Sequence, residues 1–560
     1  MNSSDPGYDG SDGFSRRRFI QLGAALGGAT LLGACGSDDN KAGSPTTIAS
    51  SVGATAGSTP VESIASTTVN SASNSAPTTG AGTPRSGGRL RAGIANGGAS
   101  DTLDPTRAAS GADFFRVQSL FDALTRTTAD IKTEMQLAES IEPNADGTQW
   151  TIRIRDGVTF HDGKPFTLDD VIYSLNRTQK VQIVGRAATA VIDFANLKKS
   201  DARTLVVPLT KARAEFPADL TQVWIVQDGA DDASFAKPMG TGPFSYSAFT
   251  PGQSSLFKRN TNYWQNGRPY LDELEFITIS DGTARVNALL GGQVDVADQL
   301  LYTQAKQYKN SKDIVVNVSE PGNWVPMTMA CDTAPFDDVR VRQAMRLIAD
   351  RNELLANAQL GYGEIGNDLW AKGLPGYNDS LPQRVQDIDQ AKSLLKAAGK
   401  EGLKVSLDAS AVAPGMLESA TLFAQQAKKA GVEITINNVP PGDYYGPNYL
   451  KYTFGQSSWV AGTVSGLMQA SVGPDATYNE THFNDPAFNK LYTESQGTLD
   501  EAKRNEMLFE CQKILYDTGG YIIWGLSPYI DGLSPKVQNM LSTPTYPLGG
   551  GDFTNVWLQA

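Results

Sequence analysis

The chain has 560 residues, which at ~100–200 residues per domain corresponds to two to four domains or lobes. Hydrophobic residues make up 40% and aromatic residues 9%, so a sizeable core can form and disorder throughout is excluded. The net charge of −12 gives no general attraction to nucleic acid. Two histidines and three cysteines exclude a multi-histidine zinc cluster and a disulfide framework, and we expect no metal and no cofactor.

The first segment has the pattern of an export signal. Residues 15–21, Ser-Arg-Arg-Arg-Phe-Ile-Gln, precede an apolar stretch over 22–34 that is shorter than the ~20 residues of a membrane span. The arginines followed by Phe-Ile resemble a twin-arginine signal, and Leu-Gly-Ala-Cys at 32–35 resembles a bacterial lipobox. We therefore expect a signal peptide over 1–34 and a lipid on Cys35. The protein would then be located on the extracytoplasmic face of the membrane. The alternative is an ordinary signal peptide with a chance cysteine.

A flexible segment follows the signal. Forty of the 53 residues in 36–88 are Ser, Thr, Ala, Gly or Pro, and none is aromatic. Such a segment buries too little apolar area to offset its ordering entropy, and its reach as a coil is on the order of 40 Å. We predict a disordered tether over 35–88, between a membrane anchor and a folded body that begins near residue 89. A body outside the cytoplasm argues against ATP- or NAD-dependent activity.

The folded body begins with a strand and helices. Trp150, Ile152 and Ile154 alternate with polar residues and predict a half-buried strand. Thr167, with Asp170 three residues later, predicts a helix start. Apolar residues at helical spacing predict two further helices, one within 337–350 after Asp337 and Asp338, and one over 391–398 that ends at Gly399.

Residues 403–436 predict a crossover unit. Alternating strands at 403–407 and 432–436 enclose a helix over 416–430 that ends at Gly431. Short links between a strand, a helix and a strand favour a βαβ unit, and hence some parallel sheet. The fold class that follows is α/β, with mixed sheets flanked by helices.

The sequence lacks the common catalytic motifs. It has no Walker A loop, no H-E-x-x-H, no C-x-x-C and no G-x-S-x-G. Residues 361–366 match G-x-G-x-x-G, but they follow a helix-like stretch over 353–360 and are interpreted as a turn. We therefore predict that the protein is not an enzyme.

The histidines and cysteines favour structural roles. His161 beside Asp162 could act as a general base, but the turn residues around it favour structural hydrogen bonding. His482 precedes an Asn-Asp-Pro turn signal and is expected on the surface or packed. Cys331 and Cys511 could form one disulfide or remain two free thiols.

Several segments together resemble one family. The matching segments are 137–140, 146–147, 150–154, 155–167, 170–175, the Gly-Thr-Gly-Pro-Phe turn at 240–244, 259–260, 263–264, 269–272 and 335–344. They cover about 89–530, and the block over 137–177 is specific. This ordered set is similar to the family 5 extracellular solute-binding proteins of ABC importers, the peptide-, nickel- and opine-type receptors.

The resemblance implies a two-lobed, type II periplasmic-binding-protein-like fold with a hinge. Lobe I would take 89–325 and 526–560, with a subdomain near 131–236, and lobe II would take 326–525. A small solute or a peptide would bind between them, and the closed form would be recognised by an ABC permease with its ATPase subunits. We expect a monomer without nucleic-acid partners. A sensor lipoprotein on the same fold is an alternative, and an extracellular hydrolase is a remote one.

Aromatic residues are the candidates for the ligand-binding cleft, because flat rigid surfaces contact varied solutes at low entropy cost. One position departs from the peptide-binding pattern Trp-x-Ala-Asp: Gly462 stands where these members have the aspartate that pairs with the α-ammonium. We therefore expect a ligand that lacks a free α-amine or anchors it differently, for which Asp475 in a shifted loop is one route. Direct nickel ligation is not expected, although a metal chelate held by small ligands stays open. The candidates are Trp459, Trp324, Asn323, Trp370, Tyr444, Tyr445, Phe115 and Gly462.

Overall fold

The computed structural model describes residues 82–180 and 186–559. The predicted signal peptide, Cys35 and the tether up to residue 81 lie outside these residues. The described chain is a two-lobed α/β fold built on mixed sheets, as predicted.

The first lobe is built on a seven-stranded mixed sheet. Its central strand β1 (Arg89–Ile94) runs parallel to both neighbours, β10 and β11, and the remaining pairs are antiparallel. Helix α2 (Gly111–Leu120) begins at Ser110, which forms a capping box with Asp113. The strand order is β12 (Val315–Val318), β21 (Ile530–Leu533), β11 (Val296–Ala297), β1, β10 (Glu273–Thr278), β9 (Ser254–Arg259) and β8 (Phe244–Thr250).

Residues 138–208 contribute the strands of a separate, four-stranded antiparallel sheet. Strand β5 (Gln149–Ile154) buries Trp150, Ile152 and Ile154, so the predicted alternation is confirmed. Helix α3 (Leu168–Lys180) follows Thr167, whose backbone N–H donates to the Asp170 carboxylate at 2.8 Å. The order is β4 (Ala138–Pro143), β5, β7 (Thr204–Pro208) and β6 (Lys198–Lys199).

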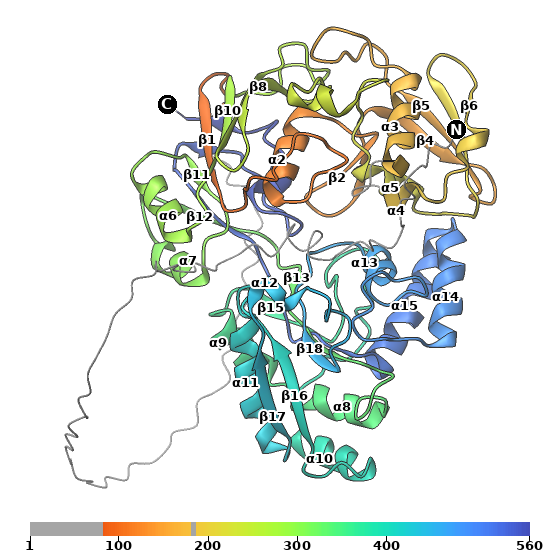
Figure 1. The fold of residues 1–560 in the computed structure, drawn as a ribbon, viewed down its shortest axis with the longest axis vertical. Coiled ribbons are helices and arrows are strands. Elements are labelled where there is room, and N and C mark those ends of the chain that lie inside the picture. The colour runs from red at the N-terminus through yellow and green to blue at the C-terminus, as the bar shows by residue number, and fades with distance from the viewer. Residues whose placement is uncertain (1–81, 181–185, 560) are drawn as a thin grey trace, which may run out of the picture. The chain divides into compact units, whose positions relative to one another are not determined.

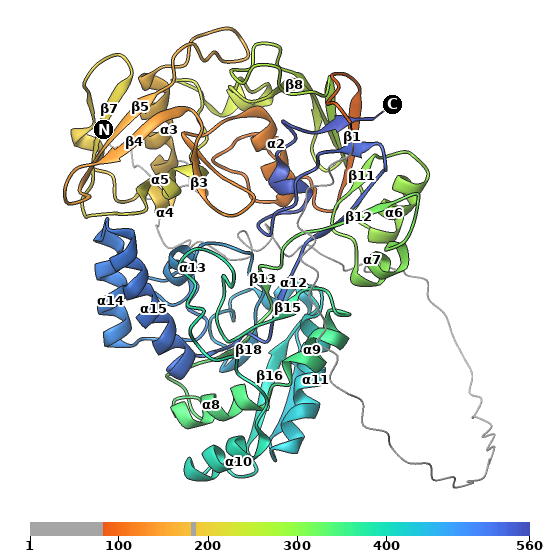
Figure 2. The same ribbon diagram turned by 180° about the vertical axis from the view of Figure 1, so that it is seen from behind.

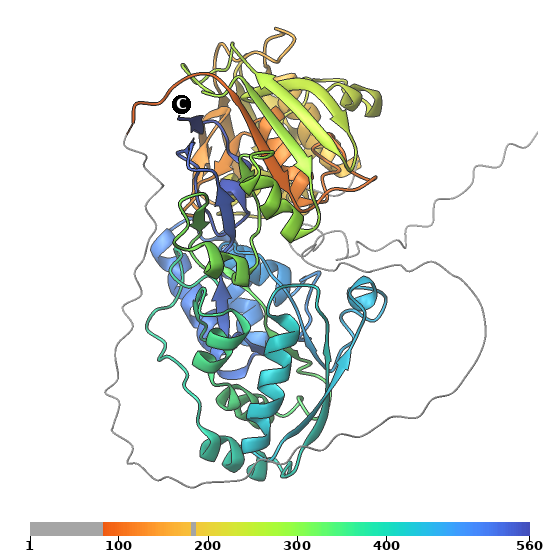
Figure 3. The ribbon, with the colours of Figure 1, turned by 90° about the vertical axis from the view of Figure 1, so that its left-hand side faces the viewer.

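The second lobe is built on a five-stranded mixed sheet. The βαβ unit is confirmed: β16 (Lys404–Ala409) and β17 (Glu433–Asn438) are parallel, and α11 (Met416–Lys429) connects them and packs on them (Figure 3). The predicted helices are α8 (Val339–Ile348), capped by Asp338, and α10 (Ile388–Ala397), which ends before Gly399 at φ +66°. The order is β17, β16, β18 (Phe454–Gln456), β14 (Met327–Met329) and β19 (Tyr521–Ile522).

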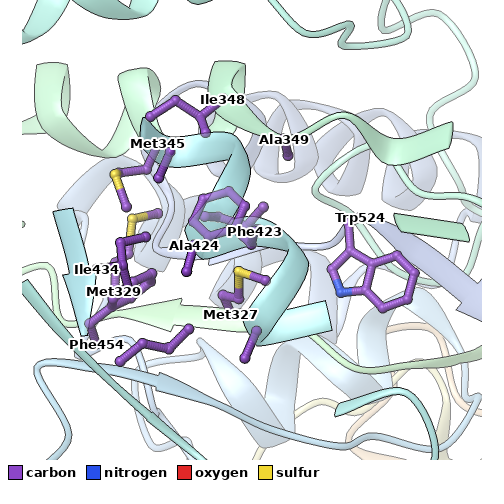
Figure 4. Packing of buried hydrophobic residues seen from close by; sticks show 14 of the residues in the cluster. Met327, Met329, Met345, Ile348, Ala349, Phe423, Ala424, Ile434, Phe454 and Trp524 are labelled. Carbon is purple, nitrogen blue, oxygen red and sulfur yellow. The ribbon is translucent and has the colours of Figure 1, made fainter. Parts of the chain in front are cut away.

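Methionine and aromatic side chains fill the core of this lobe. Met327 and Met329 on β14 lie beneath α11, close to Phe423 (Figure 4). Phe454 packs against Phe423 with ring centroids 6.4 Å apart. Unbranched Met side chains fill the irregular space between helix and strands, so the lobe has a continuous apolar layer.

The chain passes between the two large sheets at two short strands that pair with each other. In β13 (Asn323–Trp324) and β20 (Gly525–Ser527), Asn323 lies opposite Ser527 in antiparallel register. Strand β15 (Glu364–Ile365) completes a small sheet with β20. Figure 1 shows β13 and β15 between the sheet of β1 and the sheet of β16.

The remaining elements cover the sheets or connect them. Figures 1 and 2 both show α14 and α15 side by side. The remaining elements, with their bounds, are β2 (Thr125–Thr127), β3 (Thr133–Met135), α4 (Arg186–Thr189), α5 (Phe216–Asp219), α6 (Gly282–Leu290), α7 (Tyr302–Tyr308), α9 (Arg351–Ala358), α12 (Pro441–Tyr444), α13 (Val464–Ser471), α14 (Pro486–Gly497), α15 (Glu501–Thr518), β22 (Val537–Gln538), β23 (Trp557–Leu558) and the short turns η1 (Phe194–Asn196), η2 (Leu220–Gln222), η3 (Asp232–Ala236) and η4 (Leu548–Gly551).

The G-x-G-x-x-G match is a turn, as predicted. Its first three residues lie in the link between α9 and β15, with Gly361 at φ +81° and Gly363 at φ +103°, and the match then runs through β15. A Cβ on Gly363 would lie 2.1 Å from the Leu526 carbonyl oxygen. Both glycines therefore serve the backbone path rather than a dinucleotide.

The Gly-Thr-Gly-Pro-Phe turn is held by His161, which confirms its structural role. The Gly240 N–H donates to His161 Nδ1 at 3.2 Å, so Nε2 carries the proton and donates to the Gly242 carbonyl at 3.0 Å. Permissive backbone angles do not explain the two glycines, because neither has a positive φ. They are required by close approach: a Cβ on Gly240 would lie 1.9 Å from the Leu120 carbonyl oxygen.

The other histidine and the cysteines also have structural surroundings. His482 contacts Asp332 through Nδ1 at 2.8 Å and the Leu450 carbonyl through Nε2 at 2.7 Å. Cys331 and Cys511 are both free thiols, which settles the alternative that the sequence left open.

Candidate functional site

A pocket lies at the crossing strands and draws residues from both lobes. Its cavity volume is about 60 Å³. One wall comes from the segment after β11 and the segment around β21, and the other from the loop before α11 and the segment after β18. The lining residues are Gln299, Leu300, Leu301, Tyr302, Asn323, Trp324, Val325, Ala413, Pro414, Ser458, Trp459, Val460, Ser527, Pro528, Tyr529 and Ile530.

The pocket wall is uncharged. None of the lining residues found in the described chain is Asp, Glu, Lys, Arg or His. Asn323 is committed to the crossing: its Oδ1 accepts from the Ala461 N–H at 3.2 Å and its Nδ2 donates to the Ser527 carbonyl at 3.3 Å. An ionised ligand group would lose its hydration here without meeting a counter-charge, so the wall favours neutral groups.

Three tryptophans form a stack beside the pocket. Trp324 lies between Trp459 at 5.3 Å and Trp370 at 5.4 Å, with interplanar angles of 5° and 17°. Tyr521 meets the central ring edge-on at 5.4 Å. The backbones of Trp324 and Trp459 also form a β-bridge, so ring stacking and backbone pairing rigidify the same wall.

Hydrogen bonds fix the two outer tryptophans. Trp459 Nε1 donates to the buried Glu480 carboxylate at 2.9 Å, and Tyr521 donates to the same oxygen at 3.1 Å. Trp370 Nε1 donates to the Val464 carbonyl at 3.3 Å. Trp324 Nε1, in the centre, has no hydrogen-bond partner among the described residues.

A buried charged cluster supports the first-lobe wall from behind. Arg285 Nε lies 3.0 Å from Asp298, and the Gln299 N–H donates to Asp531 at 3.0 Å. Burial raises the pKa of Asp298 to about 6, although Arg285 and the Ala95 N–H oppose the rise. Burial likewise raises the pKa of Asp531 to about 7, against two backbone N–H donors. These groups hold the backbone of Gln299 at φ +52°, an angle that is uncommon for residues other than glycine or asparagine.

The predicted site residues fall into two groups. Trp324, Trp459 and Asn323 line the pocket, and Trp370 is the third member of the stack. The others do not line it. Tyr444 and Tyr445 pack in the second-lobe core, Phe115 stacks on Phe276 in the first-lobe core, and Gly462 lies next to Leu467. As ligand contacts, all eight stay predictions.

Sequence reasoning missed most of the first-lobe wall. Gln299, Leu300 and Tyr302 follow β11, whose carboxyl end lies beside that of the parallel strand β1. Carboxyl ends of parallel strands are common ligand sites, so polar residues after a short apolar strand were the available signal. Asp475, the alternative carboxylate, is exposed and does not line the pocket.

The lobes also touch away from the pocket. Arg213 forms a bidentate ion pair with Asp219, at 2.7 and 2.8 Å, and donates to Gln496 at the end of α14. The Ala214 N–H donates to the Gln496 carbonyl at 2.7 Å. The four-stranded region of the first lobe is therefore in direct contact with the second.

The described residues contain neither a metal-binding cluster nor a membrane-spanning helix. Over 82–180 and 186–559, no group of three or more His, Cys, Asp or Glu side chains is arranged to hold a metal ion. In the same ranges, no helix combines the length and the apolar character needed to cross a membrane.

Comparison with known proteins agrees with the fold. Heme-binding protein A of Haemophilus influenzae is 27% identical over 456 residues, covering 73% of this chain and 82% of that protein. The dipeptide-binding protein of Escherichia coli is 25% identical over 468 residues, covering 76% and 86%. The crystal structure of the ABC transporter substrate-binding protein CtaP from Listeria monocytogenes superposes with a TM-score of 0.76 at 19% identity, covering 85% and 100%.

The family assignment rests on a direct match. Residues 132–480, more than half of the chain, match the family described as "Bacterial extracellular solute-binding proteins, family 5 Middle". This range holds the four-stranded sheet, the first crossing strand and most of the second lobe. The chain belongs to the bacterial extracellular solute-binding proteins of family 5.

Proposed function

We propose that this protein is a lipid-anchored receptor that captures a small solute between its lobes and delivers it to the permease of an ABC importer. The observation that carries the proposal is the pocket at the crossing strands, whose walls come from both lobes. A ligand that contacts both walls stabilises the closed arrangement by differential contact, and no covalent step is needed.

The proposal includes the domain boundaries expected from the sequence. Lobe I takes 89–325 and 526–560 with a subdomain over 131–236, and lobe II takes 326–525. Strands β13 and β20 support these limits because they pair beside both boundaries. The cavity of about 60 Å³ supports movement at this hinge, since sites for drug-sized ligands measure roughly 300–1,000 Å³.

Lobe closure is testable in solution. Saturating solute should reduce the radius of gyration in small-angle X-ray scattering and change tryptophan fluorescence, because Trp324 and Trp459 line the pocket. Unchanged scattering on addition of a solute that stabilises the protein would contradict closure.

The solute we propose is peptide-like or another small molecule without a free α-ammonium at this pocket. Two curated relatives are named for heme and for dipeptide binding, so the family accommodates different ligands. The uncharged wall supports the absence of an ammonium partner here. Burying an unpaired ammonium costs several kcal/mol.

A thermal-shift screen with matched peptides tests the ligand class. Bound ligand raises the melting temperature by mass action. Peptides with acetylated N-termini should stabilise the protein at least as well as the same peptides with free N-termini. Stabilisation by free-amine peptides alone would contradict the proposed class.

Membrane attachment is tested through Cys35. Metabolic labelling with a fatty acid should mark the native protein, and Cys35→Ala should be released in soluble form. Equal membrane retention of the Cys35→Ala variant would contradict lipid anchoring and leave the ligand-binding proposal intact.

A further inference from the structure

Buried polar atoms without partners identify two particular pocket residues. Across the described residues, several buried side-chain N and O atoms have no hydrogen-bond partner within the protein. Only two of these atoms belong to residues that line the pocket: Gln299 Oε1 and Trp324 Nε1. Leaving a buried donor or acceptor unpaired costs about 1–3 kcal/mol, so each atom gains from a partner outside the chain.

Both residues are deeply buried and firmly held. Trp324 is 0% exposed and fixed between two parallel rings, and Gln299 is 7% exposed. The Gln299 backbone is tied at both polar groups: its N–H donates to Asp531, and its carbonyl accepts from Arg285 at 3.3 Å. Its positive φ is therefore imposed by its neighbours, and such strain concentrates at ligand clamps.

The two atoms are chemically complementary. An indole N–H only donates, and the amide oxygen Oε1 only accepts. The pocket wall around them carries no charge. A neutral group that offers both an acceptor and a donor satisfies the two atoms without bringing a charge into the pocket, and the amide is the commonest such group in peptide-like solutes.

We propose that Gln299 and Trp324 are specificity-determining residues that bind neutral amide groups of the solute. A solute carbonyl oxygen accepts from Trp324 Nε1, and a solute amide N–H donates to Gln299 Oε1. This inference rests on the proposed receptor function and names the chemistry by which the pocket selects its ligand. The two residues come from different elements, because Trp324 lies on β13 and Gln299 follows β11.

The test compares amide and ester probes by isothermal titration calorimetry. The amide probe is N-acetyl-trialanine N-methylamide, and each of its analogues replaces one amide N–H by an ester oxygen. Wild-type protein should bind at least one ester analogue about fivefold more weakly, since one hydrogen bond contributes about 1 kcal/mol. Gln299→Met should bind the amide probe about fivefold more weakly and lose the preference for amide over ester. Trp324→Phe should weaken binding by a similar factor but keep that preference.

Control variants separate recognition from folding. Trp150→Phe and Gln359→Met remove equally unpartnered buried groups that do not line the pocket, and both should bind like the wild type. If Gln299→Met fails to fold, Gln299→Asn serves instead, because asparagine tolerates the positive φ and withdraws the oxygen by one methylene. It should show the same loss of preference.

Three outcomes are decisive. A Gln299→Met or Gln299→Asn protein that still prefers the amide probe would overturn the assignment of Gln299, and wild-type affinity in Trp324→Phe would overturn that of Trp324. Wild-type protein that binds neither probe type, yet is stabilised by other solutes, would overturn the amide assignment and leave the receptor function standing. The absence of stabilisation by any solute in a broad panel would instead overturn the receptor function.

Discussion

The two histidines of this chain are set to opposite protonation behaviour by their surroundings. Burial lowers the pKa of His161, although its bond to the Gly242 carbonyl opposes the shift. For His482 partial burial also opposes protonation, but the Leu450 carbonyl and Asp332 outweigh it and raise the pKa. The His161 ring is thus neutral and has a structural role. The His482 ring forms an ion pair with Asp332.

This contrast gives a prediction for NMR. With two histidines in the whole sequence, imidazole spectra should contain two titrating signals, and the signal lost in His482→Gln should titrate at the higher pH. Asp332→Asn should lower the pKa of His482 and leave His161 unchanged. A histidine whose pKa is raised by folding stabilises the fold fully at pH values below its pKa in the unfolded chain. The contribution of His482 is therefore lost as the pH rises through its pKa in the folded state. Titration of His161 above His482 would contradict this assignment.

Sequence reasoning at the residue scale succeeded where chemistry was local. The turn that begins at Gly361 follows from its own glycines, and it was predicted. A structural role for His161 was predicted from the turn residues beside it, but its partners Gly240 and Gly242 lie about 80 positions away and were not. The pairing of Gln299 with Asp531 could not be predicted, because the two residues are 232 positions apart in the sequence. A motif shows what a residue can do, but the partner that fixes it is set by the fold.

At the scale of elements, the contact between the 240–244 turn and the end of α2 leaves no room for a side chain. Gly240→Ala should lower the free energy of unfolding by roughly 2 kcal/mol or more, because the added Cβ meets a backbone carbonyl that cannot rotate away. Urea denaturation measures the change. Gly442→Ala is the control: its Cβ meets nothing within 4 Å, and it should be nearly neutral. Equal stability of the two variants would be evidence against the close approach.

Helices and the βαβ unit were predictable because their signals repeat along a continuous segment. The periodicity of 416–430 and the alternation on either side specified α11, β16 and β17 together. The small crossing sheet was beyond such reasoning. Strands β13, β20 and β15 have two or three residues each, too few for a period, and they pair across about 160 to 200 positions of sequence.

For the molecule as a whole, buried carboxyl groups set the pH dependence of stability. Burial raises the pKa of Asp122 to about 7, although Trp264, Thr241 and Tyr263 all donate to it. Asp298 and Asp531 are raised to about 6 and about 7. In each case the folded state keeps a proton that the unfolded chain has already released near pH 4.

The free energy of unfolding should therefore fall between about pH 4 and about pH 7. A raised carboxyl pKa contributes stability that is complete below the unfolded pKa and is lost as the pH rises through the folded value. Denaturation curves at a series of pH values measure the slope, and Asp122→Asn should make it shallower. A free energy that rises over this interval would show that these carboxyl groups are ionised in the fold.

The position of β21 has a consequence for the order in which the lobes assemble. Residues 530–533 lie between β12 and β11, so the last tenth of the sequence forms an inner strand of the first sheet. When the chain is synthesised from its N-terminus, it can complete the second sheet once residue 522 is available. At that point the first sheet still lacks the strand between β12 and β11. The lobe that begins first in the sequence is thus the last to be finished, and its closure is a long-range step of the kind that slows folding.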